Sequence, residues 1–169
     1  MSATHQRDHV CNLAKSNPTK ALAQARKIDD PWFRAQGLSW VARFVDGDPV
    51  AIAGEAAKAA QECGDGYKKS AVRAWEIAAL AERGCVKEAR KSLSAALALG
   101  KCVEPISSRS EALLLLLQAA FRISRDEAQK VDEILRASCP ADGHWRCQRA
   151  VQDCGKMLLG QLEPRPFFW

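Results

Sequence analysis

In its middle the chain reads Ala71-Val-Arg-Ala-Trp-Glu-Ile-Ala-Ala-Leu-Ala-Glu-Arg-Gly-Cys-Val-Lys-Glu-Ala89. Alanine and leucine are strong helix formers, and they recur here at helical spacing. Gly84 interrupts the pattern, and a second helical stretch begins two residues later. Glycine directly after a periodic run is typical of a helix end. The segment therefore predicts two helices joined by a tight turn.

The same pattern recurs along the chain, with a degenerate last copy, which indicates internal repeats. Equivalent alanines stand at Ala35, Ala71, Ala112 and Ala150, so successive spacings are 36, 41 and 38 positions. Spacings of this order are typical of helical arrays, whose units stack because one unit cannot bury its apolar stripe alone. We predict an all-α fold, a right-handed α-solenoid of about four stacked helix pairs plus an N-terminal helix.

Helix boundaries follow from prolines, glycines and capping residues, and strand signals are nearly absent. The expected helices cover residues 4–15, 18–28, 31–45, 49–63, 67–83, 86–99, 105–123, 124–138 and 144–159. The helix at 105–123 is expected to be the most buried, because both of its faces are apolar. We expect a single helical-repeat domain over 1–162. Residues 163–169 are expected to form a non-helical aromatic tail, because two prolines oppose a helix there.

One segment resembles a known repeat type. Ile77-Ala78, Gly84, Ala89, Leu93 and Ala96 are similar to the tetratricopeptide helix-turn-helix, and the resemblance extends over about residues 31–160. The uneven spacing is closer to HEAT-like repeats. In the tetratricopeptide family the first helix of each pair lines a concave binding face. The resemblance therefore implies partner-binding positions at Arg34, Arg73, Glu76, Arg109, Gln118 and Arg149.

Composition points to a folded protein. Hydrophobic residues make up 47% and charged residues 27%, which excludes wholesale disorder. No apolar run approaches the roughly 20 residues that span a bilayer, and the polar start lacks a secretory signal. We therefore expect a cytoplasmic protein. The seven cysteines are scattered, with no C-x-x-C pair, and most of them are expected to be reduced fillers of helix interfaces.

Aromatic and basic residues recur at related positions, which leaves two hypotheses for a partner. Aromatics near helix starts, or one turn further on, form either a stacking ladder or ordinary core, with core favoured: Trp32, Phe33, Trp40, Tyr67, Trp75 and Trp145. Basic residues near the same starts would form a ridge if they align: Arg34, Lys68, Lys69, Arg109, Arg146 and Arg149. We expect a protein or peptide partner. Nucleic-acid binding through the basic ridge is the alternative.

No sequence motif predicts catalysis, a cofactor or a metal site. The chain has no G-x-S-x-G element, Gly-rich phosphate loop or H-E-x-x-H motif, so we expect no enzymatic activity. Two Cys/His groups have spacings that match no established zinc module: His5, His9 and Cys11, and Cys139, His144, Cys147 and Cys154. We therefore expect neither a metal nor a cofactor.

The chain ends in three aromatic residues, Phe167, Phe168 and Trp169. Left in water they would form an exposed apolar patch, which folded proteins usually avoid. The favoured expectation is that they cover the last helix pair as an end cap. The alternative is that they enter the groove of another copy and form a homodimer. This alternative makes Phe167, Phe168 and Trp169 candidates for binding a partner.

Overall fold

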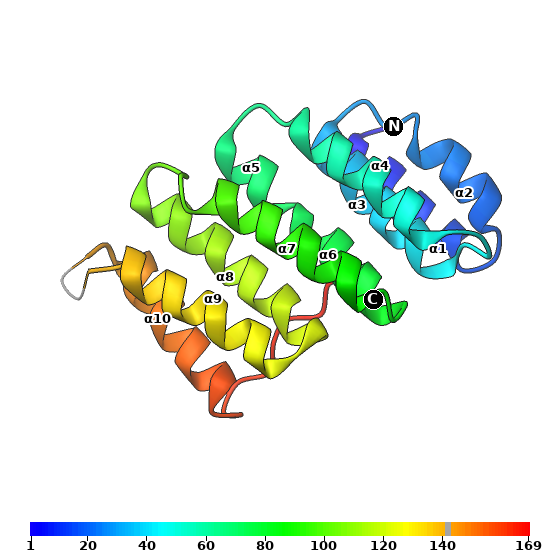
Figure 1. Ribbon diagram of the computed structural model, residues 1–169. Coiled ribbons are helices and arrows are strands. Elements are labelled where there is room, and N and C mark those ends of the chain that lie inside the picture. The colour runs from blue at the N-terminus through cyan, green and yellow to red at the C-terminus, as the bar shows by residue number, and fades with distance from the viewer. Residues whose placement is uncertain (141–142) are drawn as a thin grey trace.

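The computed structural model describes residues 1–140 and 143–169, and helices are the only regular secondary structure among them (Figure 1). The prediction of an all-α chain is confirmed. Within the described part, no helix is long and apolar enough to cross a bilayer. The helices are α1 (Ala3–Ala14), α2 (Pro18–Ala25), α3 (Pro31–Phe44), α4 (Pro49–Gln61), α5 (Gly66–Ala71), α6 (Arg73–Glu82), α7 (Val86–Gly100), α8 (Ile106–Ile123), α9 (Arg125–Ser138) and α10 (Trp145–Leu158).

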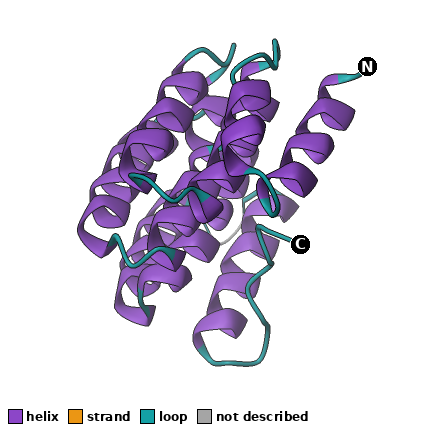
Figure 2. Ribbon diagram, turned by 90° about the vertical axis from the view of Figure 1, so that its right-hand side faces the viewer, coloured by secondary structure: helices purple, strands orange, loops and turns teal. Residues whose placement is uncertain are grey.

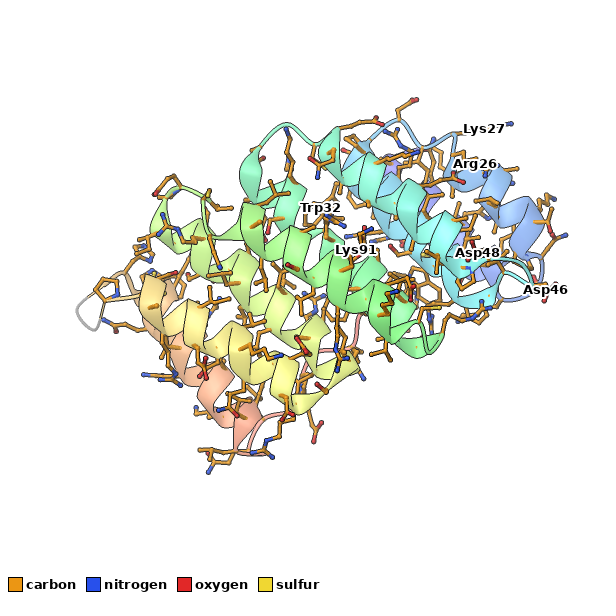
Figure 3. All side chains as sticks on the ribbon, in the orientation of Figure 1. Arg26, Lys27, Trp32, Asp46, Asp48 and Lys91 are labelled. Atoms are coloured by element: carbon orange, nitrogen blue, oxygen red, sulfur yellow. The ribbon has the colours of Figure 1, made fainter. Side chains whose placement is uncertain are left out.

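Several helices begin at the caps that the sequence contains. The Asp48 carboxylate accepts a hydrogen bond from the Val50 N–H at 2.9 Å, at the turn between α3 and α4 (Figure 3). Asp30 caps α3 in the same way, and Ser124 accepts from the Glu127 N–H at the start of α9. Such a cap contributes about 1 kcal/mol by satisfying an N–H that has no helical partner. The helix starts are therefore fixed locally.

One expected helix is interrupted. Residues 67–83 were predicted to form one helix, but the structure has α5 and α6 with a turn at Val72. The Ser70 hydroxyl donates to the Ala96 carbonyl at 3.1 Å and so joins α5 to α7. Neither glycine nor proline stands at the break, and nothing in the local sequence explains it.

The helices form two rows. In the first row, α1, α3, α6, α8 and α10 contact one another in succession. In the second row, α4 packs on α3 and α6, α7 on α6 and α8, and α9 on α8 and α10 (Figure 1). α2 packs on α1 and α3 at the N-terminal end of this row. Each second-row helix thus covers the junction of two first-row helices.

Burial is greatest in the middle of the first row. All residues of α6 from Arg73 to Leu80 are buried, whereas α8 keeps exposed or half-buried positions along one side. The expectation that the helix at 105–123 is the most buried is therefore wrong. α6 lies between α3, α4, α7 and α8, so it has neighbours on almost every side.

Candidate functional site

The C-terminal tail, residues 163–169, lies on the first-row helices of its own chain (Figure 2). At α8, the Arg165 N–H donates to the Gln118 side-chain oxygen at 3.0 Å, and Arg122 donates to the Arg165 carbonyl at 3.5 Å. At α6, the Phe167 ring meets Trp75 edge-on with 5.3 Å between ring centroids. Phe167 is only 3% exposed. The middle of the tail is therefore part of the core.

The end of the tail packs around Trp40 of α3. The rings of Phe168 and Trp169 lie 5.3 Å and 4.9 Å from it, both inclined to its plane. The Arg43 guanidinium lies 4.0 Å from the centre of the Phe168 ring, and Arg7 of α1 lies 5.3 Å from that of Trp169. Cations over aromatic faces add to the stacking energy. We call the surface under residues 163–169 the tail groove.

The tail crosses α8, α6, α3 and α1, so it does not form the expected cap over the last helix pair. Trp40 and Trp75 are buried, as the core interpretation predicted. Tail rings lie directly on both of them. These two tryptophans therefore belong to the core and also contact the tail.

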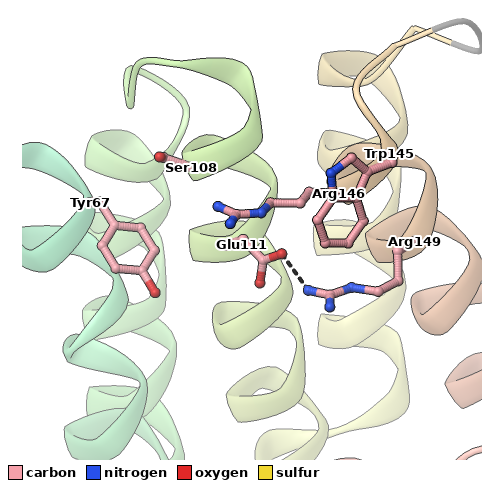
Figure 4. A pocket seen from close by; sticks show the side chains of 6 residues that line it. All are labelled: Tyr67, Ser108, Glu111, Trp145, Arg146 and Arg149. Atoms are coloured by element: carbon pink, nitrogen blue, oxygen red, sulfur yellow. Dashed lines mark hydrogen bonds and ion pairs between the residues drawn. The ribbon is translucent and has the colours of Figure 1, made fainter.

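A pocket of about 410 Å³ opens on the first-row helices near their N-terminal ends, and we call it the entry pocket (Figure 4). Its lining residues come from α5, α8 and α10: Tyr67, Ser108, Glu111, Trp145, Arg146 and Arg149. A chain of aromatic contacts joins it to the tail. Trp32 stacks on Tyr67 at 6.2 Å and meets Trp75 at 5.9 Å. The entry pocket and the tail groove are thus neighbouring parts of one surface.

The entry pocket has mixed charge. Arg149 donates to the Glu111 carboxylate at 2.5 Å, as Figure 4 shows. Arg146 has no acidic partner among the described residues. Trp145 is 58% exposed, and both guanidinium groups lie within 5.5 Å of its ring centre. An exposed indole beside an exposed arginine offers stacking and charge to the same ligand.

Burial is the main cause of a raised pKa at Tyr67, and the negative charge of Glu111 adds to it. The positive charges of Arg165 and Arg146 act in the opposite direction. The Tyr67 phenol therefore stays protonated near neutral pH and can donate a hydrogen bond into the entry pocket.

The structure separates the six positions that the repeat resemblance implied. Gln118 lies in the tail groove, and Arg149 lines the entry pocket. Arg34 donates to the Ile28 carbonyl at 2.8 Å and pairs with a glutamate, Glu62. Arg109 likewise donates to the Val103 carbonyl at 2.9 Å and pairs with Glu104. These last two arginines hold the loops before their own helices.

Arg73 and Glu76 lie on another side of α6, beside a separate cavity of about 340 Å³ between α4 and α7. Their side chains form an ion pair at 2.6 Å and are almost fully buried. Burial raises the pKa of Glu76, and the charge of Arg73 opposes the rise. They are therefore not part of the surface that carries the tail.

The cysteine and histidine residues do not assemble into a metal centre. Over residues 1–140 and 143–169, no group of three or more His, Cys, Asp or Glu side chains is placed to hold a metal ion. All seven cysteines are free, and four of them are buried: Cys11, Cys63, Cys147 and Cys154. Burial raises the pKa of Cys11 to about 12.

Two lining residues were not singled out from the sequence, Ser108 and Glu111. Both lie on α8 within one turn of Arg109. The recurrence of aromatics at helix starts did mark two of the other lining residues, Tyr67 and Trp145. No local signal marks Glu111, because the nearest basic residue in the sequence, Arg109, is only two positions away and faces another side of the helix.

Comparison of the chain with known protein families, with characterised proteins and with solved structures gives no match.

Proposed function

We propose that this chain is a non-enzymatic interaction module that binds a protein or peptide partner in the entry pocket. The fold that we propose is a right-handed α-solenoid of about four helix pairs, and the succession of contacts between neighbouring helices agrees with stacked pairs that add to a common surface. Solenoids of this kind use such surfaces for binding. The cytoplasm is the proposed location, on the sequence argument alone.

The observation that carries the proposal is the exposed Trp145 beside a pocket of mixed charge. Exposed aromatic residues and arginines are enriched where proteins bind proteins. Glu111 pairs with Arg149, whereas the exposed Arg146 pairs with no carboxylate of residues 1–140 and 143–169. A peptide presents both charges and backbone groups, so it suits this lining better than a uniformly anionic ligand.

The nucleic-acid alternative has less support. A basic ridge requires free cations that can neutralise phosphates and release counterions. Three arginines of the expected ridge are instead paired with carboxylates: Arg34 with Glu62, Arg109 with Glu104 and Arg149 with Glu111. Lys68 also lies 3.8 Å from Asp65. These pairs reduce the positive potential that a phosphate backbone would meet.

The test is a pull-down from a lysate of the source organism, with and without nuclease, at low and at moderate salt. The baits are the wild type, Trp145→Ala and Arg146→Glu, which change exposed side chains of the entry pocket. Lys58→Ala is the matched control, because Lys58 is an exposed cation on the second-row helix α4.

A protein captured by the wild type and by Lys58→Ala, but lost with both pocket variants, supports the proposal. If all four baits capture the same protein equally, that protein binds outside the entry pocket and the proposal is wrong. Recovery of nucleic acid alone in samples without nuclease, lost at moderate salt, would favour the alternative.

A further inference from the structure

We propose that the tail groove is a second peptide-binding site, whose present occupant, the tail, is exchangeable. Its ligands are extended peptides in which an arginine-proline pair precedes consecutive aromatic residues, as in Arg165-Pro166-Phe167-Phe168-Trp169. The inference rests on the proposed function, that the chain binds peptides, and extends it from the entry pocket to a second site. It names the chemical class of the partner, a peptide with aromatic residues after an arginine-proline pair, and it identifies residues 163–169 of the chain as the competitor of that peptide.

The backbone contact of the tail is of the kind that a peptide ligand makes. Gln118 is 5% exposed, and its side-chain oxygen accepts the Arg165 N–H. A buried amide needs a hydrogen-bond partner, so the groove favours an occupant that presents a backbone N–H at this point. Pro164 and Pro166, on either side, fix an extended chain and lack N–H groups of their own. The tail therefore needs few backbone partners.

The side-chain contacts explain the preference for aromatic residues. The Phe167 ring packs against Trp75, and the rings of Phe168 and Trp169 pack against Trp40. Arg43 contacts the outer ring surface of Phe168. Aromatic-lined grooves recognise extended proline-containing peptides in other binding modules, because the peptide loses little entropy on binding. A partner peptide with the same order of residues would make the same contacts.

The connection between α10 and the tail would let the tail leave without unfolding a helix. Leu159 is 71% exposed and Leu162 is 38% exposed. Gly160 between them has a φ of +71°, which glycine adopts at little cost. A short tether gives the tail a high effective concentration at the groove. The tail of the same chain is thus the competitor that a partner must displace.

The test uses the full chain, so that folding is complete before the tail is released. A protease site is inserted between Leu162 and Glu163, both exposed, and the folded protein is cut and then separated from the fragment by gel filtration. The probe is a synthetic peptide of residues 163–169 with fluorescein at its N-terminus. Its binding is followed by fluorescence anisotropy. We expect saturable binding to the cut protein and binding about 100-fold weaker to the uncut protein.

Variants of the peptide test the contacts without disturbing the protein. Phe167→Ala in the peptide removes the most buried ring and should weaken binding on the order of 30-fold. Glu163→Ala changes an exposed side chain and should have no effect. In the protein, Gln118→Leu should weaken binding about 5-fold. Trp145→Ala in the entry pocket should not change it, so the two proposals can fail separately.

Equal binding of the wild-type and Phe167→Ala peptides would overturn the inference. So would a cut protein that loses cooperative thermal unfolding with the fragment, because the tail would then be a structural segment and not a ligand. A dimer of uncut protein that the unlabelled peptide dissociates would support exchange and identify a second copy as a partner.

Discussion

Arg73 and Glu76 form the most deeply buried ion pair of the described residues, with side chains 8% and 2% exposed. Removing one charge of such a pair leaves the other without compensation in an apolar site. We expect Arg73→Met and Glu76→Leu each to lower the free energy of unfolding by about 3 kcal/mol, and the double variant to lose less than either single variant. Urea denaturation measures all three.

The matched control is Arg90→Met. Arg90 pairs with Glu127 at 3.2 Å but is 54% exposed, so its loss should cost less than about 1 kcal/mol. If the effects of Arg73→Met and Glu76→Leu simply add in the double variant, the two charges are not energetically coupled.

The same pair predicts a pH dependence. Burial raises the pKa of Glu76 above its ordinary value of 4.5, and the Arg73 guanidinium limits the rise. A carboxyl with a raised folded-state pKa favours folding while it is protonated, so stability falls as pH rises through the folded-state pKa. The Arg73→Met variant keeps Glu76 without its cation, so its free energy of unfolding should fall more steeply with pH than that of Arg73→Met/Glu76→Leu, which lacks the titrating carboxyl. Urea midpoints measured from pH 4.5 upward should show the difference.

Cysteine reactivity should follow burial. The thiolate is the reactive form, and burial raises the pKa of Cys11 to about 12 and also raises that of Cys154. Cys102 is exposed just after α7. Ellman's reagent should therefore give a fast phase with the folded protein that Cys102→Ser removes and Cys11→Ser leaves intact. A fast phase that survives Cys102→Ser would contradict this.

At the scale of the element, the end of α7 packs closely on its neighbours. A Cβ at Gly100 would lie 2.9 Å from the Ser70 hydroxyl oxygen of α5 and 3.4 Å from Leu113 of α8. Gly100→Ala should therefore lower the free energy of unfolding by about 1–3 kcal/mol, because α7 must move. Gly54→Ala in α4 meets nothing within 4 Å and should raise it by about 1 kcal/mol. Equal effects would show that α7 can shift without cost.

Helix boundaries could be predicted because their causes are local. Asp30-Pro31 and Asp48-Pro49 each combine a capping carboxylate with a proline in the first turn, and α3 and α4 begin there. The break at Val72 has no such signal, and it coincides with a contact between distant residues, Ser70 and Ala96. The spacing of apolar residues predicts that this segment is helical. It does not predict the contact between α5 and α7 that lies beside the break.

Over the whole molecule, the tail runs across the first row from α8 to α1. It is held at α8 through Gln118 and reaches α1 through Arg7. Phe167→Ala in the full chain should lower the free energy of unfolding by about 2 kcal/mol, less than in a closed core, because the tail can move into solvent and leave no sealed cavity. Hydrogen exchange should increase in α1 more than in α10.

The matched control for this prediction is Leu159→Ala, which removes a side chain that is 71% exposed. It should change neither the stability nor the exchange pattern appreciably. Faster exchange in α10 than in α1 after Phe167→Ala would show that the tail mainly stabilises its own helix.

The candidate site was only partly predictable from the sequence for a related reason. Of the six positions that the repeat resemblance implied, Gln118 contacts the tail and Arg149 lines the entry pocket. The other four lie elsewhere, because Arg34 and Arg109 hold loops and Arg73 and Glu76 lie on another side of α6. The path of the tail depends on contacts with residues that are distant in the sequence, such as those of Trp169 with Trp40 and Arg7. No local pattern encodes such a path.

The docked tail places Trp169 against Trp40, with 4.9 Å between ring centroids and 64° between ring planes. Two indoles this close and this inclined couple their electronic transitions, which gives paired bands of opposite sign in far-ultraviolet circular dichroism. The contribution of this pair requires both rings in this arrangement, so it vanishes when the tail leaves, whereas Trp32 and Trp75, 5.9 Å apart at 68°, keep theirs. The chain thus reports the occupancy of its groove optically, without any label.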